Sequence, residues 1–320
     1  MSARVRVPAT SSNLGAGFDC VGIAVDRWLT AAITIDPGGD RVVINRAGRL
    51  AALELSPEED LLTRGFRAAC AASGTPLSGG VAIDVESEIP VGCGLGSSAA
   101  AIVAGALLAD AALGLGLPRE RIVEIAADVE GHPDNVAAAV YGGAVLCVRT
   151  TDGRAWRSAA LRVTPELTFL LAVPPFASDT RAARAALPEM LPHAAAALAA
   201  SRAAALVQGL ATGDGALLAA ALEDVLHVPF RRRGIPGYDA VVAAARAAGA
   251  YGATLSGAGS AILAIAPRER AGAVGAALLA AWRETGVEAE LVRCAPPAGG
   301  AEVTHAPRTT HHARGTIHQA

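Results

Sequence analysis

The sequence predicts an α+β fold rather than a doubly wound parallel sheet, because strand-like and helix-like segments alternate without a regular βα repeat. Hydrophobic residues form 52% of the 320-residue chain, enough to bury a full core in one large domain or two smaller ones. The long apolar run at 99–117 is mostly Ala and Gly and is interrupted by Asp110. We interpret it as a buried core helix, with a membrane span as the weaker alternative.

The first half of the chain contains strands that alternate apolar and polar residues and helices with helical spacing of apolar residues. We predict a short strand at 5–7 that ends at Pro8, then a turn-rich loop at 10–19. The remaining predicted strands are 21–35, 81–85 and 144–148, and the predicted helices are 57–72, 98–115 and 118–129. The segment 130–135 breaks the last of these helices, and 151–153 predicts a hairpin turn.

The second half predicts a smaller set of strands and longer helices. The predicted strands are 167–173, 261–266 and 288–293, and the predicted helices are 182–213, 216–226, 238–248 and 268–285. A glycine loop at 254–259 precedes the second strand. We place the domain boundary near 150–165, with domains at 1–155 and 156–294, and expect a disordered tail at 295–320, where periodicity is lost.

Composition limits the functional classes. Charged residues form 18% of the chain and the net charge is −3, so nothing favours binding to nucleic acid or to an anionic membrane. The five cysteines are scattered without CxxC spacing, which fits a reducing cytoplasm better than a zinc or redox site. Arg4 and Arg6 lead directly into a polar turn, so we expect no signal peptide.

The segment Pro90–Ala101, PVGCGLGSSAAA, places three glycines and two serines before the predicted core helix. Glycines let backbone N–H groups approach a ligand, and a helix start favours an anion, so the segment predicts a phosphate site. The chain has no Lys, which excludes a P-loop. A dinucleotide-binding fingerprint is disfavoured because no regular βαβ unit surrounds the segment. The alternative to a phosphate site is a glycine-rich turn that serves only packing. In the phosphate interpretation, Ser97 and Ser98 cap the helix and face the ligand.

Two further segments point to a family. Pro8–Asp19 reads PATSSNLGAGFD, and Ser256–Gly259 is a second glycine loop. Together with the segment at 90–101 they match, in order, the three motifs of the GHMP small-molecule kinases. Glu130–Asn135 (EGHPDN), Thr180-x-x-x-Arg184 and Asp224-x-x-His227-x-Pro229-x-Arg231 make the chain most similar to the homoserine kinase family within them. The resemblance runs from about residue 4 to 294.

The resemblance implies an N-terminal domain like the second domain of ribosomal protein S5 and a ferredoxin-like C-terminal domain. It implies ATP and Mg²⁺ as cosubstrate and cofactor, and transfer of a phosphoryl group to the side-chain hydroxyl of L-homoserine, on the route to threonine. It also implies a cytoplasmic homodimer.

The resemblance assigns four overlapping groups of site residues. The ATP-binding residues are Pro90, Val91, Gly92, Cys93, Gly94, Leu95, Gly96, Ser97, Ser98, Gly257 and Gly259. Ser98 and Glu130 bind Mg²⁺, since a hydroxyl and a carboxylate are the hard oxygen ligands that it prefers. The acceptor residues are Asn13, Asp19, Asn135, Thr180, Arg184 and Arg231. The residues expected to act in catalysis are Ser98, Glu130, Asn135 and Thr180.

The chemistry of the acceptor explains these residue types. Asp19 suits its ammonium, and Arg184 and Arg231 suit its carboxylate, because an Arg fork binds a carboxylate in a bidentate pair. Asn13 and Asn135 can fix orientation, and Thr180 could touch the reacting hydroxyl. The alternative for Arg231 is a solvated surface, because Arg232 and Arg233 follow it.

No general base is evident, and the proton of the hydroxyl would pass to the phosphate or to solvent. His132, between Gly and Pro, is more typical of a structural hydrogen-bonding residue. The competing functions are a kinase of another small alcohol, an NAD-type oxidoreductase and a non-enzymatic relative.

Overall fold

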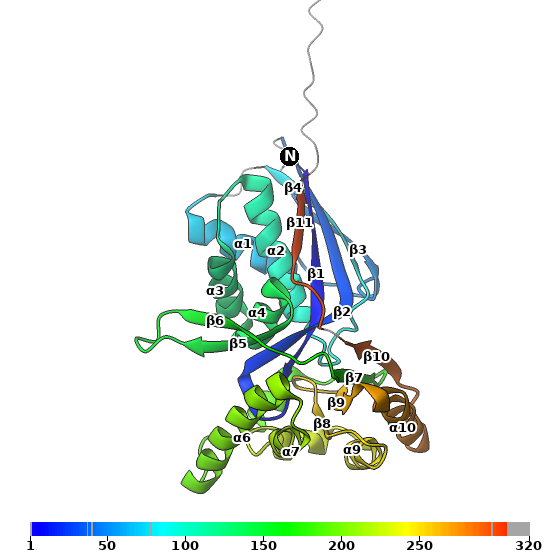
Figure 1. The fold of residues 1–320 in the computed structure, drawn as a ribbon. Helices are drawn as coiled ribbons and strands as arrows, with labels where there is room; N and C mark the ends of the chain where they lie inside the picture. Colours follow the sequence, from blue (N-terminus) through cyan, green and yellow to red (C-terminus); the bar gives the residue numbers. More distant parts are fainter. Residues whose placement is uncertain (1, 37, 40, 77–78, 296, 306–320) are drawn as a thin grey trace, which may run out of the picture.

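The computed structural model describes every residue except 1, 37, 40, 77–78, 296 and 306–320. The strands of these residues form two sheets, and helices pack against both, which confirms the predicted α+β class (Figure 1). The first sheet has seven strands, in the order β11-β1-β2-β4-β3, with β5 pairing both β2 and β6. The second has four strands, in the order β10-β7-β9-β8.

The strands of the first sheet come mostly from the first half of the chain. They are β1 Ser2–Asn13, β2 Gly17–Asp36, β3 Val42–Gly48, β4 Gly80–Ser87, β5 Ala144–Arg149, β6 Trp156–Leu161 and β11 Glu302–His305. Four helices contact this sheet or one another: α1 Leu61–Ser73, α2 Ser97–Leu113, α3 Arg119–Glu130 and α4 Asp134–Tyr141. In Figure 1 they gather on one side of the β1–β2 pair.

The second sheet and its helices form the lower part of Figure 1. Its strands are β7 Leu167–Val173, β8 Gly252–Leu255, β9 Ile262–Pro267 and β10 Glu290–Cys294. The helices of this half are α5 Thr180–Ala185, α6 His193–Thr212, α7 Gly215–Ala221, α8 Val228–Arg231, α9 Tyr238–Ala247 and α10 Ala271–Glu284. Short 3-10 turns lie at Arg232–Gly234 and Arg268–Arg270. The change of sheet falls between β6 and β7, so a boundary at 155 would cut the β5–β6 hairpin.

The core helix predicted from the apolar run is α2. Nearly all of its side chains, from Ala99 to Ala112, lie in the hydrophobic core between α1 and the first sheet. α2 is apolar around its whole circumference, as is typical of a helix that is surrounded by other parts of the protein. The core-helix interpretation is therefore confirmed for this segment.

α6 is also long and apolar enough to cross a membrane by length and composition, with a mean hydropathy of 1.4. Its last two turns are the best anchored: Leu206 and Leu210 are fully buried in the core, whereas in the first half Ala199 is buried but Leu198 is exposed. α6 therefore carries an apolar surface that the described residues leave partly open.

The first strand is longer than predicted. β1 continues through Pro8, where the register with β2 shifts, and ends at Asn13. The predicted loop at 10–19 was wrong for its first four residues, which belong to β1, and for its last three, which belong to β2. Thr10 and Ser11 are buried and bonded to other side chains rather than to water. The turn itself is confined to the residues between β1 and β2.

Several other elements differ from the sequence prediction. β3 and α4 were not predicted, and the helix expected at 182–213 is two helices because Pro188 and Pro192 interrupt it. The helix expected at 216–226 ends at Ala221, and the glycine loop at 254–259 begins inside β8.

The tail expected to be disordered from 295 contains a strand. β11 pairs antiparallel with β1, and Ala301 is buried and donates its N–H to Ala139 O at 2.9 Å. Polar residues without periodicity can still pair with a free sheet edge, since backbone groups supply the hydrogen bonds. Residues 306–320 of the expected tail lie outside the described residues.

Candidate active site

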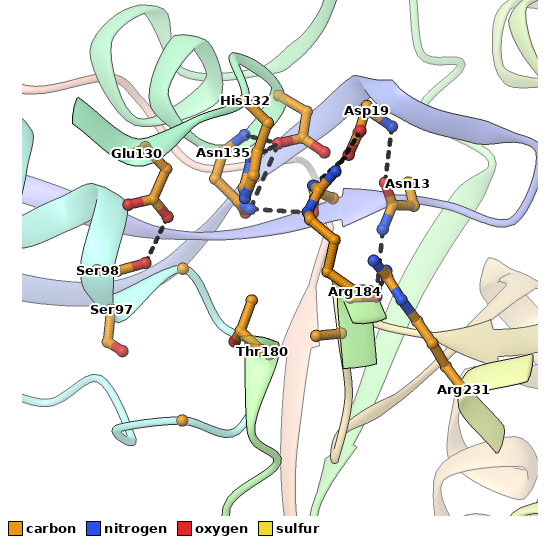
Figure 2. A pocket seen from close by; sticks show the side chains of 17 residues that line it. Asn13, Asp19, Ser97, Ser98, Glu130, His132, Asn135, Thr180, Arg184 and Arg231 are labelled. Atoms are coloured by element: carbon orange, nitrogen blue, oxygen red, sulfur yellow. Dashed lines mark hydrogen bonds and ion pairs between the residues drawn. The ribbon is translucent and has the colours of Figure 1, made fainter. Parts of the chain in front are cut away.

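A polar pocket lies where the three glycine-containing segments meet (Figure 2). Its walls come from the end of β1, the loop before α2, the turn between α3 and α4, α5, α8 and the loop after β8. The predicted site residues that line it are Asn13, Asp19, Gly92, Gly94, Gly96, Ser97, Ser98, Glu130, Asn135, Thr180, Arg184, Arg231 and Gly257. The structure thus brings together residues that lie up to 244 positions apart.

Hydrogen bonds to backbone carbonyl oxygens tie the three segments to one another. Thr10 N donates to Leu95 O at 3.0 Å, joining the first segment to the second. The Ser256 hydroxyl donates to Gly94 O at 2.6 Å, joining the third to the second. Gly257 N donates to Ser12 O at 3.2 Å and closes the set. The walls of the pocket are therefore held by contacts that do not depend on a ligand.

The glycine loop presents the start of α2 to the pocket. The helix begins at Ser97, and the residue before it is Gly96, in the left-handed conformation with φ 66°. The predicted serine cap was wrong, because the capping position holds a glycine, which has no side chain to offer. The first-turn N–H groups, which an N-cap side chain would otherwise satisfy, remain available for an anion.

Ser98 and Glu130 lie side by side at the edge of this loop. Ser98 Oγ donates to Glu130 Oε1 at 2.5 Å. Burial raises the pKa of the Glu130 carboxyl above its ordinary value, although the Ser98 hydroxyl and the nearby His132 oppose the shift. Two hard oxygen ligands therefore converge beside the helix start, as a Mg²⁺ site shared with phosphate oxygens would require.

Asp19 and Arg184 form an ion pair on the other side of the pocket. Arg184 donates from both terminal nitrogens to the two carboxylate oxygens, at 2.9 and 3.0 Å. Asp19 is held in the left-handed region with φ 54°, and its N–H donates to Asn13 Oδ1 at 3.0 Å. The two residues assigned to opposite ends of the acceptor therefore bind each other.

Arg231 is buried in the pocket wall, with 6% of its surface exposed. Its Nε donates to Ala183 O and its Nη1 to Gly257 O, both at 3.3 Å. Burial and the charge of Arg184 lower its pKa from its usual range. By contrast, Arg232 and Arg233 are exposed, and Arg232 pairs with Asp239. The solvated-surface alternative is therefore wrong for Arg231 and fits its two neighbours.

The remaining polar residues are fixed by neighbours. Asn135 accepts from the Thr10 hydroxyl at 2.8 Å and donates to Ser12 Oγ at 3.0 Å. His132 Nδ1 lies 2.7 Å from Asp134 Oδ1; burial acts to lower the pKa of the imidazole, but the Asp134 carboxylate raises it overall. This geometry agrees with the structural interpretation of His132.

Five residues predicted to bind ATP do not line the pocket: Pro90, Val91, Cys93, Leu95 and Gly259. Cys93 and Leu95 turn their side chains into the core, because residues between the glycines anchor the loop. Ser12, Asp134 and Ala258 line the pocket although they were not predicted. Each lies beside a predicted residue within one of the motifs, which was the available signal.

Family models and sequence comparisons identify relatives of the chain. The GHMP kinases N terminal domain matches residues 60–143, and the GHMP kinases C terminal domain matches residues 203–284. A homoserine kinase of Synechocystis sp. is 40% identical over 298 residues, covering 92% of this chain and 96% of the relative. A homoserine kinase of Gloeobacter violaceus is 42% identical over 280 residues, covering 87% and 92%.

Solved structures give the same picture. A homoserine kinase from Cytophaga hutchinsonii superposes with a TM-score of 0.84 at 29% identity, covering 95% of this chain and 97% of that one. An L. major mevalonate kinase superposes with a TM-score of 0.67 at 18% identity, covering 92% of this chain and 96% of that one, which shows a shared fold. The predicted fold class is therefore confirmed.

Proposed function

We propose that this chain, which belongs to the GHMP kinase family and within it to the homoserine kinases, phosphorylates the side-chain hydroxyl of L-homoserine with ATP. In the reaction the hydroxyl oxygen forms a bond to the γ-phosphorus, and the bond to the β–γ bridging oxygen breaks. The products are ADP and O-phospho-L-homoserine, and the hydroxyl proton leaves to a phosphate oxygen or to solvent.

One observation carries the proposal: a single pocket joins an uncapped helix start to a carboxylate and two arginines. The helix start suits a phosphate, and Asp19 with Arg184 and Arg231 suits the ammonium and carboxylate of an amino acid. Phosphoryl transfer depends mainly on positioning and charge neutralisation, which this combination supplies. An alcohol without an α-amino acid group would offer no charged groups to take the place of either partner in the Asp19–Arg184 ion pair.

On the phosphate side, we assign the loop from Gly92 to Ser98 to the β- and γ-phosphates. Ser98 and Glu130 would hold Mg²⁺, and their oxygens already converge at 2.5 Å, which fits an ion that also binds phosphate oxygens and water. When bound, Mg²⁺ would neutralise charge on the phosphates. Burial disfavours the charged form of the Glu130 carboxyl, and a bound cation would offset that desolvation cost.

On the acceptor side, we infer that homoserine enters between Asp19 and Arg184. Its ammonium replaces Arg184 on the carboxylate, and its carboxylate replaces Asp19 on the guanidinium. Each charged group exchanges one partner for another, so none is left without a counter-charge. Asn13 and Arg231 complete this side, and Thr180 and Asn135 lie towards the phosphate loop, where they would orient the hydroxyl.

We assign no side chain as general base. His132 lines the pocket, but its Nδ1 is engaged by Asp134, and Asn135 is an amide that takes no proton at neutral pH. In phosphoryl transfer the attacking hydroxyl can lose its proton late, to the phosphate itself.

We further propose the setting that the family implies: a cytoplasmic homodimer that acts on the route to threonine. The division into two domains is also proposed, with the boundary between Leu161 and Leu167, where the chain leaves the first sheet.

The test is a substrate screen with ATP and Mg²⁺ that compares L-homoserine with L-serine, L-threonine and mevalonate. We expect homoserine to give the highest kcat/KM, and omission of Mg²⁺ to abolish turnover. A higher kcat/KM for mevalonate would instead support a kinase of another small alcohol.

A further inference from the structure

His227 is a fully buried histidine that lies behind the acceptor side of the pocket and is not among the residues that line it. It precedes α8, the short helix that carries Arg231. A buried imidazole is costly unless both ring nitrogens have partners. The partners of His227 therefore indicate what the residue does.

The Nε2 atom of His227 faces two acceptors. It lies 3.1 Å from Gly15 O and 3.7 Å from Asp224 Oδ2. Since neither acceptor carries a proton to donate, the proton belongs on Nε2. Burial lowers the pKa of the His227 imidazole. The charge of Arg231 lowers it as well, whereas the Asp224 carboxylate acts to raise it. The ring is therefore neutral, with its other nitrogen unprotonated.

The Nδ1 atom of His227 faces the guanidinium of Arg231. Nη1 of Arg231 lies 3.5 Å from Nδ1, and a guanidinium can only donate. The Phe18 ring stacks on the imidazole, with ring centroids 5.0 Å apart and an angle of 20° between the planes. The Arg231 guanidinium carbon lies 5.2 Å from the same ring centroid. Arg231 thus contacts His227 directly and through Phe18.

Both anchors of the imidazole are rigid. Asp224 accepts hydrogen bonds from the backbone N–H groups of His227 and Val228, at 2.6 and 2.8 Å, and so fixes the start of α8. At Gly15 the chain packs against the end of α7: a Cβ there would lie 2.5 Å from Ala221 O. The position of Nδ1 is therefore determined before any ligand binds.

We propose that His227 is a positioning residue that fixes Arg231 for the acceptor carboxylate: its neutral ring, protonated at Nε2, offers the Nδ1 lone pair to Arg231 Nη1. His227 itself touches no substrate. This proposal rests on the function proposed above, since it takes Arg231 to bind the carboxylate of an amino acid.

Two amide substitutions separate the two ring nitrogens. In His227→Asn the side-chain oxygen can occupy the place of Nδ1 and still accept from Arg231, but the bond to Gly15 is lost. In His227→Gln the amide nitrogen can still reach Gly15, but the acceptor for Arg231 is lost. Both variants lose the stack on Phe18 and part of the buried packing, so each serves as a stability control for the other.

The first measurement is the dissociation constant of L-homoserine, by calorimetry without ATP, together with steady-state kinetics. We expect His227→Gln to weaken homoserine binding about tenfold, and to raise its KM equally, with kcat and the KM for ATP nearly unchanged. His227→Asn should stay within about threefold of the parent. Equal weakening in the two amide variants would overturn the proposal.

A double-mutant cycle with Arg231→Ala tests whether His227 acts through Arg231. In the Arg231→Ala background, His227→Gln should cost nothing further in homoserine binding. An undiminished tenfold loss there would mean a general packing role and would overturn the assignment.

The tautomer can be measured on the unsubstituted protein by ¹⁵N NMR, with the ring signal of His227 assigned through its scalar correlations to its own backbone. We expect a protonated Nε2 and an unprotonated Nδ1 from pH 6 to 8. A proton on Nδ1 would overturn the proposal even if both variants failed to fold. If the protein did not phosphorylate homoserine at all, the proposed function would fail, while this measurement would still decide the state of the ring.

Discussion

The two sides of the pocket are built in different ways. The phosphate side is made largely of backbone: a short contiguous loop and the first turn of α2, a helix surrounded by core. The acceptor side is made of charged side chains from segments far apart, and Arg184 of α5, an element with no buried residue, contributes to it. One side is set by local conformation and the other by long-range contacts.

Because the two sides are built differently, a substitution should impair each of them in a different way. A backbone site is lost when one residue forces the loop out of shape, because every N–H group moves together. A side-chain site loses one interaction at a time, and the loss is limited to that interaction. Changes on the phosphate side should therefore lower kcat, and changes on the acceptor side should raise the KM for one substrate.

The largest effect is expected at the pair Ser98 and Glu130. Ser98→Ala and Glu130→Gln should each lower kcat by about 100- to 1000-fold, because loss of metal-based charge stabilisation costs several kcal/mol in the transition state. Circular dichroism should show an unchanged fold. Parental rates with parental Mg²⁺ dependence in both variants would show that the metal assignment is wrong.

A loop glycine should come next. At Gly94, with φ 79°, a Cβ would lie 2.2 Å from Ser256 O, so Gly94→Ala must displace the third segment from the second. We expect kcat/KM to fall about 100-fold, as for a misplacement of reacting groups by about 1 Å.

Gly114→Ala is the matched control for this loop glycine. Gly114 has φ 66° and no atom within 4 Å of its Cβ position, so the variant should lose only about 1–2 kcal/mol of stability and keep parental kinetics. Equal kinetic losses in the two variants would mean that a left-handed alanine is harmful in itself, and not through the contact between segments.

A smaller effect, confined to one substrate, is expected at Arg231. Arg231→Ala should raise the KM for homoserine roughly 10- to 150-fold and leave the KM for ATP nearly alone, since a charge-assisted hydrogen bond contributes about 1.5–3 kcal/mol. Arg232→Ala and Arg233→Ala are the controls, because both side chains are exposed. A rise of the ATP KM alone would move Arg231 to the phosphate side.

The carboxyl of Glu130 also predicts a pH dependence of stability. Its pKa in the folded state is raised, so the protonated form is favoured by folding. The stability that this provides is present at pH below the ordinary glutamate range and is lost as the pH rises through the raised pKa. Without Mg²⁺ and ATP, Glu130→Gln should therefore melt at a higher temperature than the parent at neutral pH, and the difference should vanish in acid. A constant difference across the pH range would contradict the raised pKa.

The smallest effect on activity is expected from a change outside both sides of the pocket. Removing residues 297–320 deletes β11 and the buried Ala301, which should lower the melting temperature by several degrees and leave both KM values unchanged. Removing only 306–320 keeps β11 and serves as the control. A changed KM for either substrate in the longer truncation would mean that the pocket depends on the edge of the first sheet.

The sequence predicted the elements that depend on local conformation better than those that depend on long-range contacts. α2, its preceding loop and β7 were located from the sequence because their signals are contiguous: an unbroken apolar run, or glycines directly before it. The end of β1 was not, because Thr10 and Ser11 are polar residues whose partners lie far along the chain. β11 has no local signal, since its stability comes from the edge of β1.

Within the pocket, the resemblance located the residues but not their contacts. Asp19 and Arg184 are 165 positions apart, and no pattern in the sequence shows that they pair with each other. His227 was noticed only as part of a motif, and its contact with Gly15 spans 212 positions. Residue identity is local information, whereas the charge balance of the pocket depends on the tertiary fold.

The pairing of Asp19 with Arg184 has one more consequence, for the response to ionic strength. The pair carries no net charge, and an amino acid zwitterion is neutral overall, so the remaining charge of Arg231 on this side of the pocket steers it only weakly. Screening by salt should therefore hardly change the rate at which homoserine associates. ATP carries several negative charges, and its binding should weaken as salt is added. Two substrates of one enzyme would thus respond differently to the same counterions.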